Sequence, residues 1–390
     1  MDYFERACML RSETAAHRRY LHQHAEIGMC LPMTAAYIKK ELTSIGCTPM
    51  ALGGDGVVAE IGRPGKVVLL RAEVDALPMP DESGLPFACP NGTTGHTCGH
   101  DLHGAALLTA AKMLKENEAS LRGTVRLLFQ PGEETFEGAA AMIEAGLLRS
   151  PRPDIAYTGH VTTRYPVGTI AMRAGATMAS CYSFRILITG KTSHGACPEE
   201  GIDPINIGAH INLAMQELLA REIAFDDKVT LTFGMFRAVN VPNTIPEQAE
   251  LQGTLRTFDN ELRKRLIRRI GEIARSTAQT YCGTAELFVN ADVPVEYNDP
   301  ALYADAKRYI GESTKADMVE EVQMTGSDDF AFITEQIPAV NAFLGAQVSA
   351  HTGACYPAHH PKVLFEEDVL PYAAAAYASV ADRWLQEYCL

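Results

Sequence analysis

The sequence predicts an α/β protein in which a mixed, mostly parallel sheet is flanked by helices and a smaller domain is inserted. Three observations favour this class. Strand-like and helix-like segments alternate up to about residue 160, which is typical of parallel sheets joined by helices. From about residue 182 the order becomes βαββαβ, the ferredoxin-like arrangement. With 390 residues, the chain is also too long for one ordinary hydrophobic core.

The first part of the chain supplies most of the larger domain. Its strand-like segments are short apolar runs, and each runs into polar residues. Helices are expected over residues 2–25, 32–46, 102–117 and 138–148, and strands over 67–70, 124–129 and 154–160. Open α/β sheets build their sites at the carboxyl ends of parallel strands, so polar groups that end these strands are expected to meet in one crevice.

The inserted pattern begins near Cys181, and α/β character returns after Pro300. Between these points the strands and helices follow the ferredoxin-like order. Strands are expected over residues 182–189, 228–238, 249–258 and 285–293, and helices over 204–220 and 260–281.

Composition limits the partners and the compartment. The formal net charge of −14 argues against nucleic acid or an anionic membrane as the main partner. The first residues carry acidic groups where a secretion signal has an apolar core, and no apolar run approaches the ~18 residues of a membrane span. Ten scattered cysteines then indicate reduced thiols in a cytoplasmic protein.

The segment from Cys98 to His103 (CGHDLH) is the sharpest chemical signal. Thiolate and imidazole are both ligands of zinc-like metals, and Gly99 permits a tight turn that aims Cys98 and His100 in one direction. The alternative is a polar loop before a helix, with Asp101 as its N-cap.

Two further strands also run into candidate ligands. Glu133 and Glu134 follow one strand, and His160 ends another. Adjacent carboxylates can divide into a metal ligand and a general base, although a solvated acidic turn is the commoner reason for such a pair. Any one of these histidines, including His359, is more often structural than a ligand. Their co-occurrence favours a two-metal site with five ligands.

These segments together resemble the aminoacylase and carboxypeptidase G superfamily of metallopeptidases. The closer resemblance is to the branch that holds hippurate hydrolases, N-acyl-L-amino-acid amidohydrolases and the plant hydrolases of indoleacetyl–amino acid conjugates. It spans nearly the whole chain through HRRYLHQHAEIG, LLRAEVDALPM, GHTCGHDLH, LFQPGEE, GKTSHGACPEEGIDP, NTIPEQAELQGTLRTFD, TGSDDFAF and HHPKVLFEED. The resemblance implies a catalytic domain over residues 1–177 and 295–390 and a dimerisation domain over 178–294.

The resemblance also implies roles for individual residues. It places metal ligands at Cys98, His100, Glu134, His160 and His359, the general base at Glu133, and a ligand-orienting acid at Asp75. In the inserted domain it implies binding of the substrate carboxylate or the oxyanion by His194, Asn243 and Arg256, and a pocket loop at Gly326 and Ser327. Without the resemblance, Arg256 is read as a surface ion-pair residue and His194 as a polar loop residue.

The function that follows is metal-dependent hydrolysis of the amide bond of N-acyl amino acids, in a homodimer with two divalent ions (Zn, Mn, Co or Ni) per subunit. The alternatives are a dipeptidase or carboxypeptidase of the same superfamily, a thiol hydrolase with Cys98 as nucleophile and His100 as base, and a non-catalytic metal-binding relative. One residue departs from the family pattern, because Glu73 stands where Asp is usual. His360, next to His359, leaves two possible registers, of which the spacing to Pro361 favours His359.

Overall fold

The computed structural model describes residues 1–238, 241–348 and 355–389 and divides into two compact units. Unit 1 consists of Met1–Thr177, Tyr297–Val322 and Asp328–Leu390, and unit 2 consists of Met178–Glu296 and Gln323–Ser327. Each unit has a hydrophobic core of its own. None of the helices in the described residues combines the length and the apolar character needed to cross a membrane.

Unit 1 is built on an eight-stranded mixed sheet of order β1-β2-β4-β3-β5-β16-β6-β15. The central strands β4, β3, β5 and β16 are parallel to one another, β6 and β15 form a further parallel pair, and the other pairs are antiparallel. The predicted mixed, mostly parallel sheet is therefore confirmed. The strands are β1 (Met50–Leu52), β2 (Gly56–Gly62), β3 (Val67–Glu73), β4 (Thr124–Gln130), β5 (Ile155–Pro166), β6 (Thr169–Met172), β15 (Asp317–Glu320) and β16 (Ala339–Gln347).

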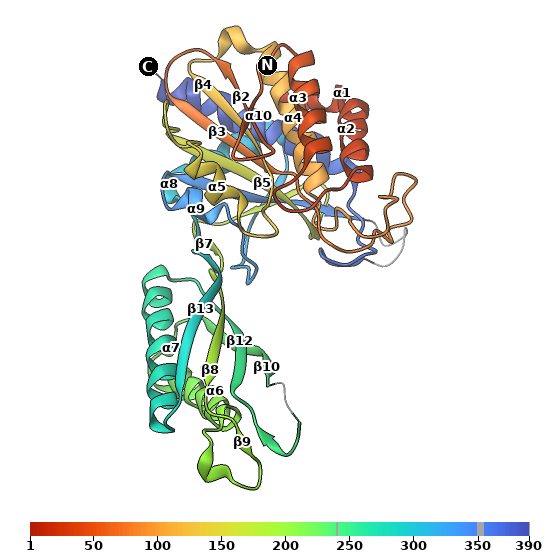
Figure 1. The fold of residues 1–390 in the computed structure, drawn as a ribbon. Coiled ribbons are helices and arrows are strands. Elements are labelled where there is room, and N and C mark those ends of the chain that lie inside the picture. The colour runs from red at the N-terminus through yellow and green to blue at the C-terminus, as the bar shows by residue number, and fades with distance from the viewer. Residues whose placement is uncertain (239–240, 349–354, 390) are drawn as a thin grey trace. The chain divides into compact units, whose positions relative to one another are not determined.

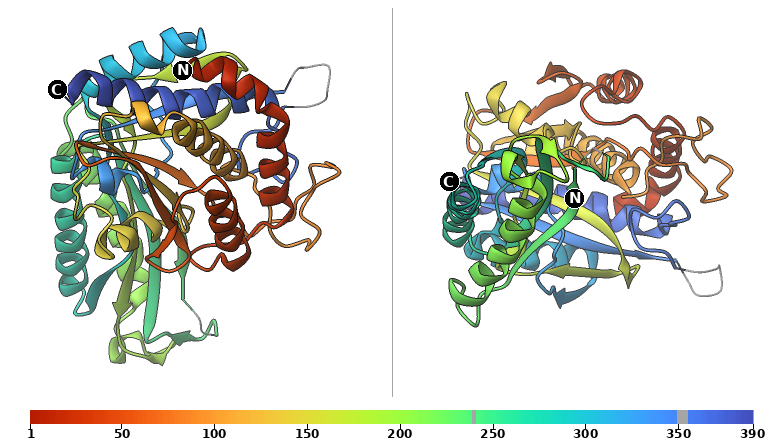
Figure 2. Two further views of the ribbon diagram at one scale, coloured as in Figure 1. Left: turned by 90° about the horizontal axis from the view of Figure 1, so that it is seen from above. Right: turned by 60° about the horizontal axis from the view of Figure 1, so that its bottom comes forward.

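Helices cover both faces of this sheet (Figure 1). Strand β3 is buried along its whole length, because Val68 and Leu70 pack into one core while Leu69 packs into a second. The first core contains residues of α1 (Tyr3–Met9), α3 (Pro32–Ser44), α4 (His100–Glu116), α8 (Pro300–Thr314) and α10 (Leu370–Tyr388), and the second contains residues of α5 (Gly138–Glu144) and α9 (Ala331–Thr334). The left view of Figure 2 shows α8 and α10 side by side. A strand buried on both faces is typical of a parallel sheet.

Several expected elements differ from those observed. The helix expected over residues 138–148 ends at Glu144. The helix expected over residues 2–25 is two helices, α1 and α2 (Arg11–Gln23), which meet at Leu10. The strand expected to end at His160 continues to Pro166, because β16 pairs with it beyond the last pairing with β3, at Thr158. The prediction of a strand end at His160 was wrong, and His160 lies inside β5.

Unit 2 has the βαββαβ order that the sequence predicts: β8 (Cys181–Thr189), α6 (Pro204–Arg221), β10 (Val229–Arg237), β12 (Gln248–Thr257), α7 (Asn260–Thr280) and β13 (Thr284–Val293). The four strands form an antiparallel sheet of order β10-β12-β8-β13 (Figure 1). Alternate residues of β8, such as Phe184 and Ile186, are buried against α6 and α7. Two short strands, β9 (Ser193–His194) and β11 (Thr244–Ile245), form a separate pair. Strands β7 (Gly175–Met178) and β14 (Glu296–Asn298) also pair with each other.

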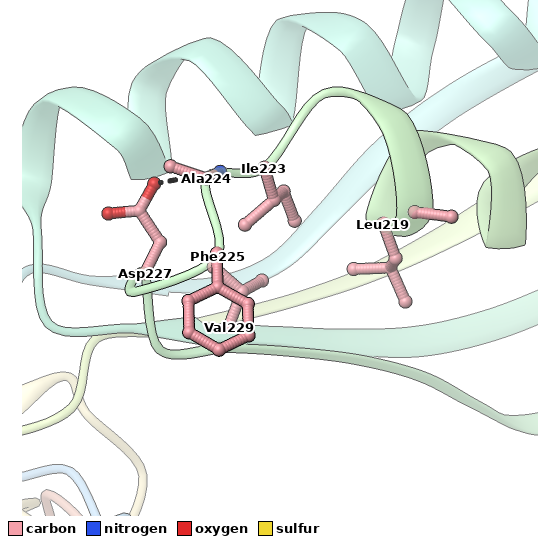
Figure 3. A pocket seen from close by; sticks show the side chains of 7 residues that line it. Leu219, Ile223, Ala224, Phe225, Asp227 and Val229 are labelled. Carbon is pink, nitrogen blue, oxygen red and sulfur yellow. Dashed lines mark hydrogen bonds between the residues drawn. The ribbon is translucent and has the colours of Figure 1, made fainter.

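A shallow hollow lies beyond the end of α6. Figure 3 shows the side chains of Leu219, Ile223 and Val229 around it. Asp227 is its one ionisable residue, and that carboxylate accepts a hydrogen bond from the backbone N–H of Ala224. One carboxylate that binds a turn provides neither a metal cage nor a nucleophile–base pair, so the lining of this hollow offers no group for either kind of chemistry.

Candidate metal centre

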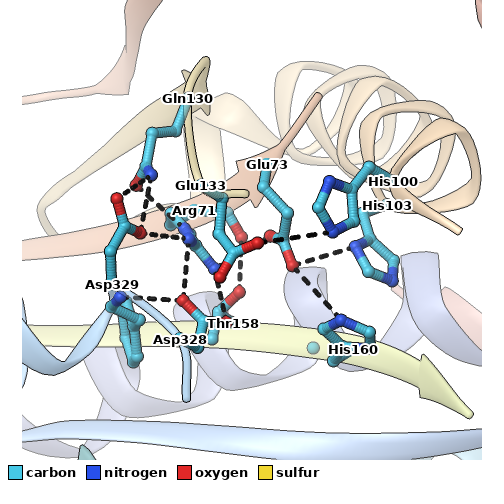
Figure 4. A network of polar contacts seen from close by, with 12 residues as sticks. Arg71, Glu73, His100, His103, Gln130, Glu133, Thr158, His160, Asp328 and Asp329 are labelled. Atoms are coloured by element: carbon cyan, nitrogen blue, oxygen red, sulfur yellow. Dashed lines mark hydrogen bonds and ion pairs between the residues drawn. The ribbon is translucent and has the colours of Figure 1, made fainter. Parts of the chain in front are cut away.

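The polar residues at the ends of β3 and β4 lie close to the start of α4 and to His160 in β5 (Figure 4). The register of β3 and β4 explains why these residues lie together, because Glu73, the last residue of β3, is paired with Gln130, the last residue of β4. Parallel neighbours end at the same edge of a sheet, so the residues that follow each strand emerge together. The structure thus gathers in unit 1 the predicted metal ligands and both Asp75 and Glu133.

The turn before α4 depends on glycine. Gly99 has a φ of 89° and is the N-cap of α4, and a Cβ built on it lies 2.4 Å from Cγ2 of Val161. Any other residue is therefore both strained and obstructed at this position. The helix begins at His100 rather than at 102, so Asp101 is not its N-cap. Asp101 is buried in the first turn and accepts hydrogen bonds from Arg18 and His22.

Backbone carbonyl groups fix the orientation of two imidazole rings. Nδ1 of His100 lies 2.9 Å from the carbonyl oxygen of Asp75, and Nδ1 of His160 lies 2.7 Å from that of Val161. Because a carbonyl oxygen only accepts, each Nδ1 carries the proton and donates it. In the neutral ring, Nε2 then has the free lone pair, which is the usual arrangement of a histidine that binds a metal.

The candidate ligand atoms lie within a few ångströms of one another. Sγ of Cys98 is 3.5 Å from Nε2 of His160. Oε1 of Glu134 is 3.9 Å from Nε2 of His100 and 3.5 Å from Nε2 of His359. In the described residues, Nε2 of His100 and Oε1 of Glu134 are buried without a hydrogen-bond partner. Sulfur, nitrogen and oxygen atoms that converge in this way fit zinc-like divalent ions.

His359, rather than His360, faces this cluster. Its backbone has a φ of 66° and its N–H donates to the carbonyl oxygen of Thr97, which joins the late histidine to the segment before α4. His360 stacks on Tyr356 instead, with ring centroids 4.1 Å apart. The geometry therefore agrees with the register that the spacing to Pro361 favours.

The two adjacent glutamates occupy different environments. The backbone N–H of Glu134 donates to Oδ2 of Asp75, at 3.1 Å, so Asp75 contacts the segments that carry both Glu134 and His100. Glu133 is buried, with Oε2 3.9 Å from Nε2 of His100. Burial, together with the charges of Asp328 and Glu134, raises the pKa of the Glu133 carboxyl well above its ordinary value. A raised pKa suits a carboxylate that has to accept a proton near neutral pH.

Burial also controls the protonation of the other candidate ligands. It raises the pKa of the Cys98 thiol, and Glu134 adds to this effect. Burial and the neighbouring His103 lower the pKa of His160 to about 3. The imidazole is thus neutral and ready to bind a cation, whereas the thiol has to lose its proton when a cation binds.

Sequence reasoning missed the ionic network that supports these residues. Arg71 is fully buried and donates to Glu73, Asp328 and Asp329 at 2.9–3.0 Å. Gln130 links Arg71 to Asp329 (Figure 4). A buried cation needs such partners, so an arginine at the end of an apolar strand was the available signal. The two aspartates directly follow Gly326 and Ser327 in the motif TGSDDFAF.

Sequence reasoning also missed a second ionic network, which joins His22 of α2 to Asp101 and Asp81. Both nitrogens of the buried His22 ring contact carboxylates, Nδ1 at 2.8 Å from Asp101 and Nε2 at 2.9 Å from Asp81. Burial opposes protonation of this ring, but the two carboxylates outweigh it and raise the pKa of His22 to about 9. The ion pair of His22 and Asp101 therefore connects α2 to the first turn of α4, next in sequence to the candidate ligand His100.

The remaining predicted residues lie in unit 2 and form two local groups. His194 of β9 pairs with Thr244 of β11, and the N–H of Gly195 donates to the carbonyl oxygen of Asn243, at 2.7 Å. Nδ1 of His194 lies 3.0 Å from the N–H of Ala196 and accepts from it, so the proton is on Nε2.

The second group contains Arg256, which donates to Oγ of Ser327 at 2.9 Å and to the carbonyl oxygen of Thr325 at 3.1 Å. Gly326 lies between these two partners in sequence. The partners of Arg256 are thus a hydroxyl and a carbonyl, rather than the carboxylate of the surface ion pair considered above.

Comparison with known proteins shows which family and which relatives this chain is similar to. The model of the peptidase family M20/M25/M40 matches residues 69–383. An N-acetyl-L-cysteine deacetylase of Bacillus subtilis is 34% identical over 388 residues, which are 96% of this chain and 89% of that protein. The IAA-amino acid hydrolase ILR1-like 4 of Arabidopsis thaliana is 34% identical over 379 residues, with coverage of 95% and 85%. The crystal structure of the YXEP protein of Bacillus subtilis, a dinuclear metal binding peptidase from the M20 family, matches with a TM-score of 0.83 and 31% identity, covering 97% of this chain and 99% of that one.

Proposed function

This chain belongs to the peptidase family M20/M25/M40 and is a metal-dependent amidohydrolase, and we propose that it cleaves N-acyl amino acids into a carboxylic acid and a free amino acid. The observation that carries the proposal is the convergence of the Cys98 thiol with imidazole nitrogens and a carboxylate oxygen beside the buried carboxylate of Glu133. Among the described residues, Nε2 of His100 and Oε1 of Glu134 are buried there without a hydrogen-bond partner. The relatives named as a deacetylase of N-acetylcysteine and as a hydrolase of an amino acid conjugate support an amide of an amino acid as the substrate.

We propose that two divalent ions (Zn, Mn, Co or Ni) bind to Cys98, His100, Glu134, His160 and His359. Ions at such a site act as Lewis acids on the scissile carbonyl and make water more acidic. The protein's own residues then handle the protons and the substrate. Glu133 accepts a proton from water and delivers it to the leaving amine, while Asp75 holds His100 and the backbone of Glu134 in place.

The substrate carboxylate calls for cationic and hydrogen-bonding groups. Arg256 provides a planar guanidinium, which suits bidentate binding of a carboxylate, and Asn243 provides an amide. Gly326 and Ser327 line the same pocket in this proposal. Hydrogen bonds from Arg256 to Ser327 and to Thr325 support the assignment, because they hold the guanidinium next to that loop.

The thiol-hydrolase alternative is disfavoured by the state of Cys98. A nucleophilic cysteine has a lowered pKa in an electropositive setting, whereas burial and Glu134 raise the pKa of this thiol. All ten cysteines lie in the described residues, and none of them forms a disulfide. Free thiols throughout support the cytoplasm as the compartment that we propose.

A panel of acylated amino acids tests the substrate class. We expect N-acetyl, N-benzoyl and N-indoleacetyl amino acids to be hydrolysed with kcat/KM at least about 10-fold above that for dipeptides with a free amino group, measured by release of the amino acid. Blocking the substrate carboxylate as an amide is expected to raise KM, because Arg256 loses its partner. Faster turnover of dipeptides than of every acylated compound would favour the dipeptidase alternative.

We further propose a homodimer in which His194 acts at the metal centre of the partner subunit. The proton on Nε2 of His194 makes that nitrogen a donor, which suits stabilisation of a developing oxyanion. His194→Ala and Glu133→Gln subunits are each expected to be nearly inactive. After subunit exchange their mixture is expected to regain up to about a quarter of wild-type activity, because half of the dimers are mixed and each has one complete site.

A matched control uses subunits that carry both substitutions. Mixed with His194→Ala subunits, they form no complete site, so no recovery is expected. If confirmed exchange of the single variants restores nothing, or if the wild-type protein is active as a monomer, His194 does not act in the partner's site.

A further inference from the structure

We propose that Glu73 is a further metal ligand of this protein and that its Oε1 binds the same ion as His160. The inference rests on the metal centre of the proposed function and adds a residue to it. Its basis is the position of one buried carboxylate oxygen among three imidazole rings.

One oxygen of Glu73 is already held. The side chain is fully buried at the end of β3, and Oε2 accepts a hydrogen bond from Nη1 of Arg71, at 2.9 Å. Arg71 is itself fixed by Asp328 and Asp329. The carboxylate therefore has little freedom to rotate, and Oε1 points towards the histidines (Figure 4).

The other oxygen lacks a satisfactory partner. Oε1 of Glu73 forms no hydrogen bond within the described residues, although it lies 3.1 Å from Nδ1 of His103 and 4.0 Å from Nε2 of His160. Glu73, His100, His103 and His160 offer ligand atoms that all lie within 4.8 Å of one another. A buried carboxylate oxygen whose nearest contact is one poorly aligned imidazole nitrogen is incompletely stabilised, so this position suits a cation.

His103 is not a metal ligand, despite its place in this group. Its Nε2 accepts a hydrogen bond from the backbone N–H of Val161, at 2.8 Å, and so carries no proton. The proton of the neutral ring is then on Nδ1, the nitrogen that faces Glu73, and a protonated nitrogen has no lone pair for a metal. His103 is therefore a positioning residue for Glu73. Glu73, His100 and His160 remain as ligands, and His160 also lies next to Cys98.

The length of the Glu73 side chain supports its assignment as a metal ligand. Aspartate at position 73 places its carboxylate about 1.5 Å closer to the backbone of β3, the length of one carbon–carbon bond. The extra methylene of Glu73 brings Oε1 out to the imidazoles. An added carboxylate oxygen also makes the ligand set harder, which moves its preference towards ions such as Mn²⁺.

Cobalt(II) is the probe for this ligand, because its visible bands report the ligand number and a near-ultraviolet band reports thiolate binding. The metal-free full-length protein and its Glu73→Gln and Glu73→Asp variants are loaded with Co²⁺, and affinity is measured by competition with a chelator. We expect both variants to bind one ion more weakly by at least the roughly 10–100-fold that loss of an outer partner of a metal ligand causes. At saturation their visible bands are expected to shift, while the thiolate band remains.

Glu321→Gln is the matched control. Glu321 is a buried carboxylate of unit 1 that contacts Arg164 and Tyr165 and belongs to no candidate ligand group. Its substitution is expected to leave the cobalt spectrum unchanged. Glu73→Asp keeps a negative charge beside Arg71. If the Glu73→Gln variant does not fold, the cobalt spectrum of Glu73→Asp decides whether Glu73 is a metal ligand.

Visible bands that stay unchanged at saturation overturn the proposal, whether or not affinity falls, because Glu73 then acts through its charge alone. The proposed function fails separately. If the wild-type protein itself binds no cobalt with a thiolate band, the metal centre is wrong, and that result precedes any effect at Glu73.

Discussion

Replacing Glu133 by Gln is expected to lower kcat by about 10²–10⁴-fold while the protein still binds its metal ions. The amide has nearly the shape of the carboxylate but cannot accept a proton. Glu133 is buried beside Nε2 of His100, and burial raises the pKa of its carboxyl, so it is the group placed to move a proton. Steady-state kinetics on an N-acyl amino acid, together with elemental analysis of the same samples, measure both parts of the expectation.

Glu137→Gln is the matched control for this variant. Glu137 lies in the same loop after β4 but is exposed to solvent, and its carboxylate accepts a hydrogen bond from Thr135. Near-wild-type kcat is expected for it. If Glu133→Gln also kept near-wild-type kcat at full metal occupancy, the general base would have to be sought among other residues.

Removing the metal ions is expected to abolish turnover, and restoring a divalent ion is expected to bring it back. In the cluster of Cys98, His100 and Glu134, two buried atoms, Nε2 of His100 and Oε1 of Glu134, have no hydrogen-bond partner among the described residues. The proposed role of the cluster is to bind the ions that activate the amide. The measurement is activity before and after dialysis against a strong chelator, and again after addition of Zn²⁺, Mn²⁺, Co²⁺ or Ni²⁺ in separate samples.

The same experiment separates the metal mechanism from the thiol alternative. A thiol hydrolase retains activity in the chelator and loses it on alkylation of Cys98, with an acyl group trapped on that cysteine. Active protein that contains no metal by elemental analysis would exclude the metal centre proposed here.

Much of the fold could be predicted because local patterns carry it. Apolar runs such as residues 67–70 fit strands buried on both faces, and the change of pattern near Cys181 marks the ferredoxin-like order. Element ends were less predictable. The end of β5 was misplaced because its later residues are held by β16, a strand more than 170 residues further along the chain.

The sequence indicated which residues belong to the candidate site, but it indicated less well which of their atoms contact one another. Cys98, His100 and Glu134 stand out in the sequence by their chemistry and by their place after apolar runs. The roles of His103 and Arg71 were missed. The position of Arg71 after an apolar run was the one signal for it, and both roles depend on partners that only the folded chain brings together.

The sequence by itself determined the fold class, the order of the elements and the kinds of ligand available, since these depend on neighbouring residues and on the period of the apolar pattern. Only the tertiary structure decided which atoms meet. The pairing of β3 with β4 places Glu73 at the same edge as Glu133, and two carbonyl groups bind Nδ1 of His100 and of His160, so that each Nε2 faces other candidate ligands. It also decided that one oxygen of Glu73 contacts Arg71 while the other faces the imidazoles. Register and ring orientation are set by packing between segments far apart in the chain, so no local pattern contains them.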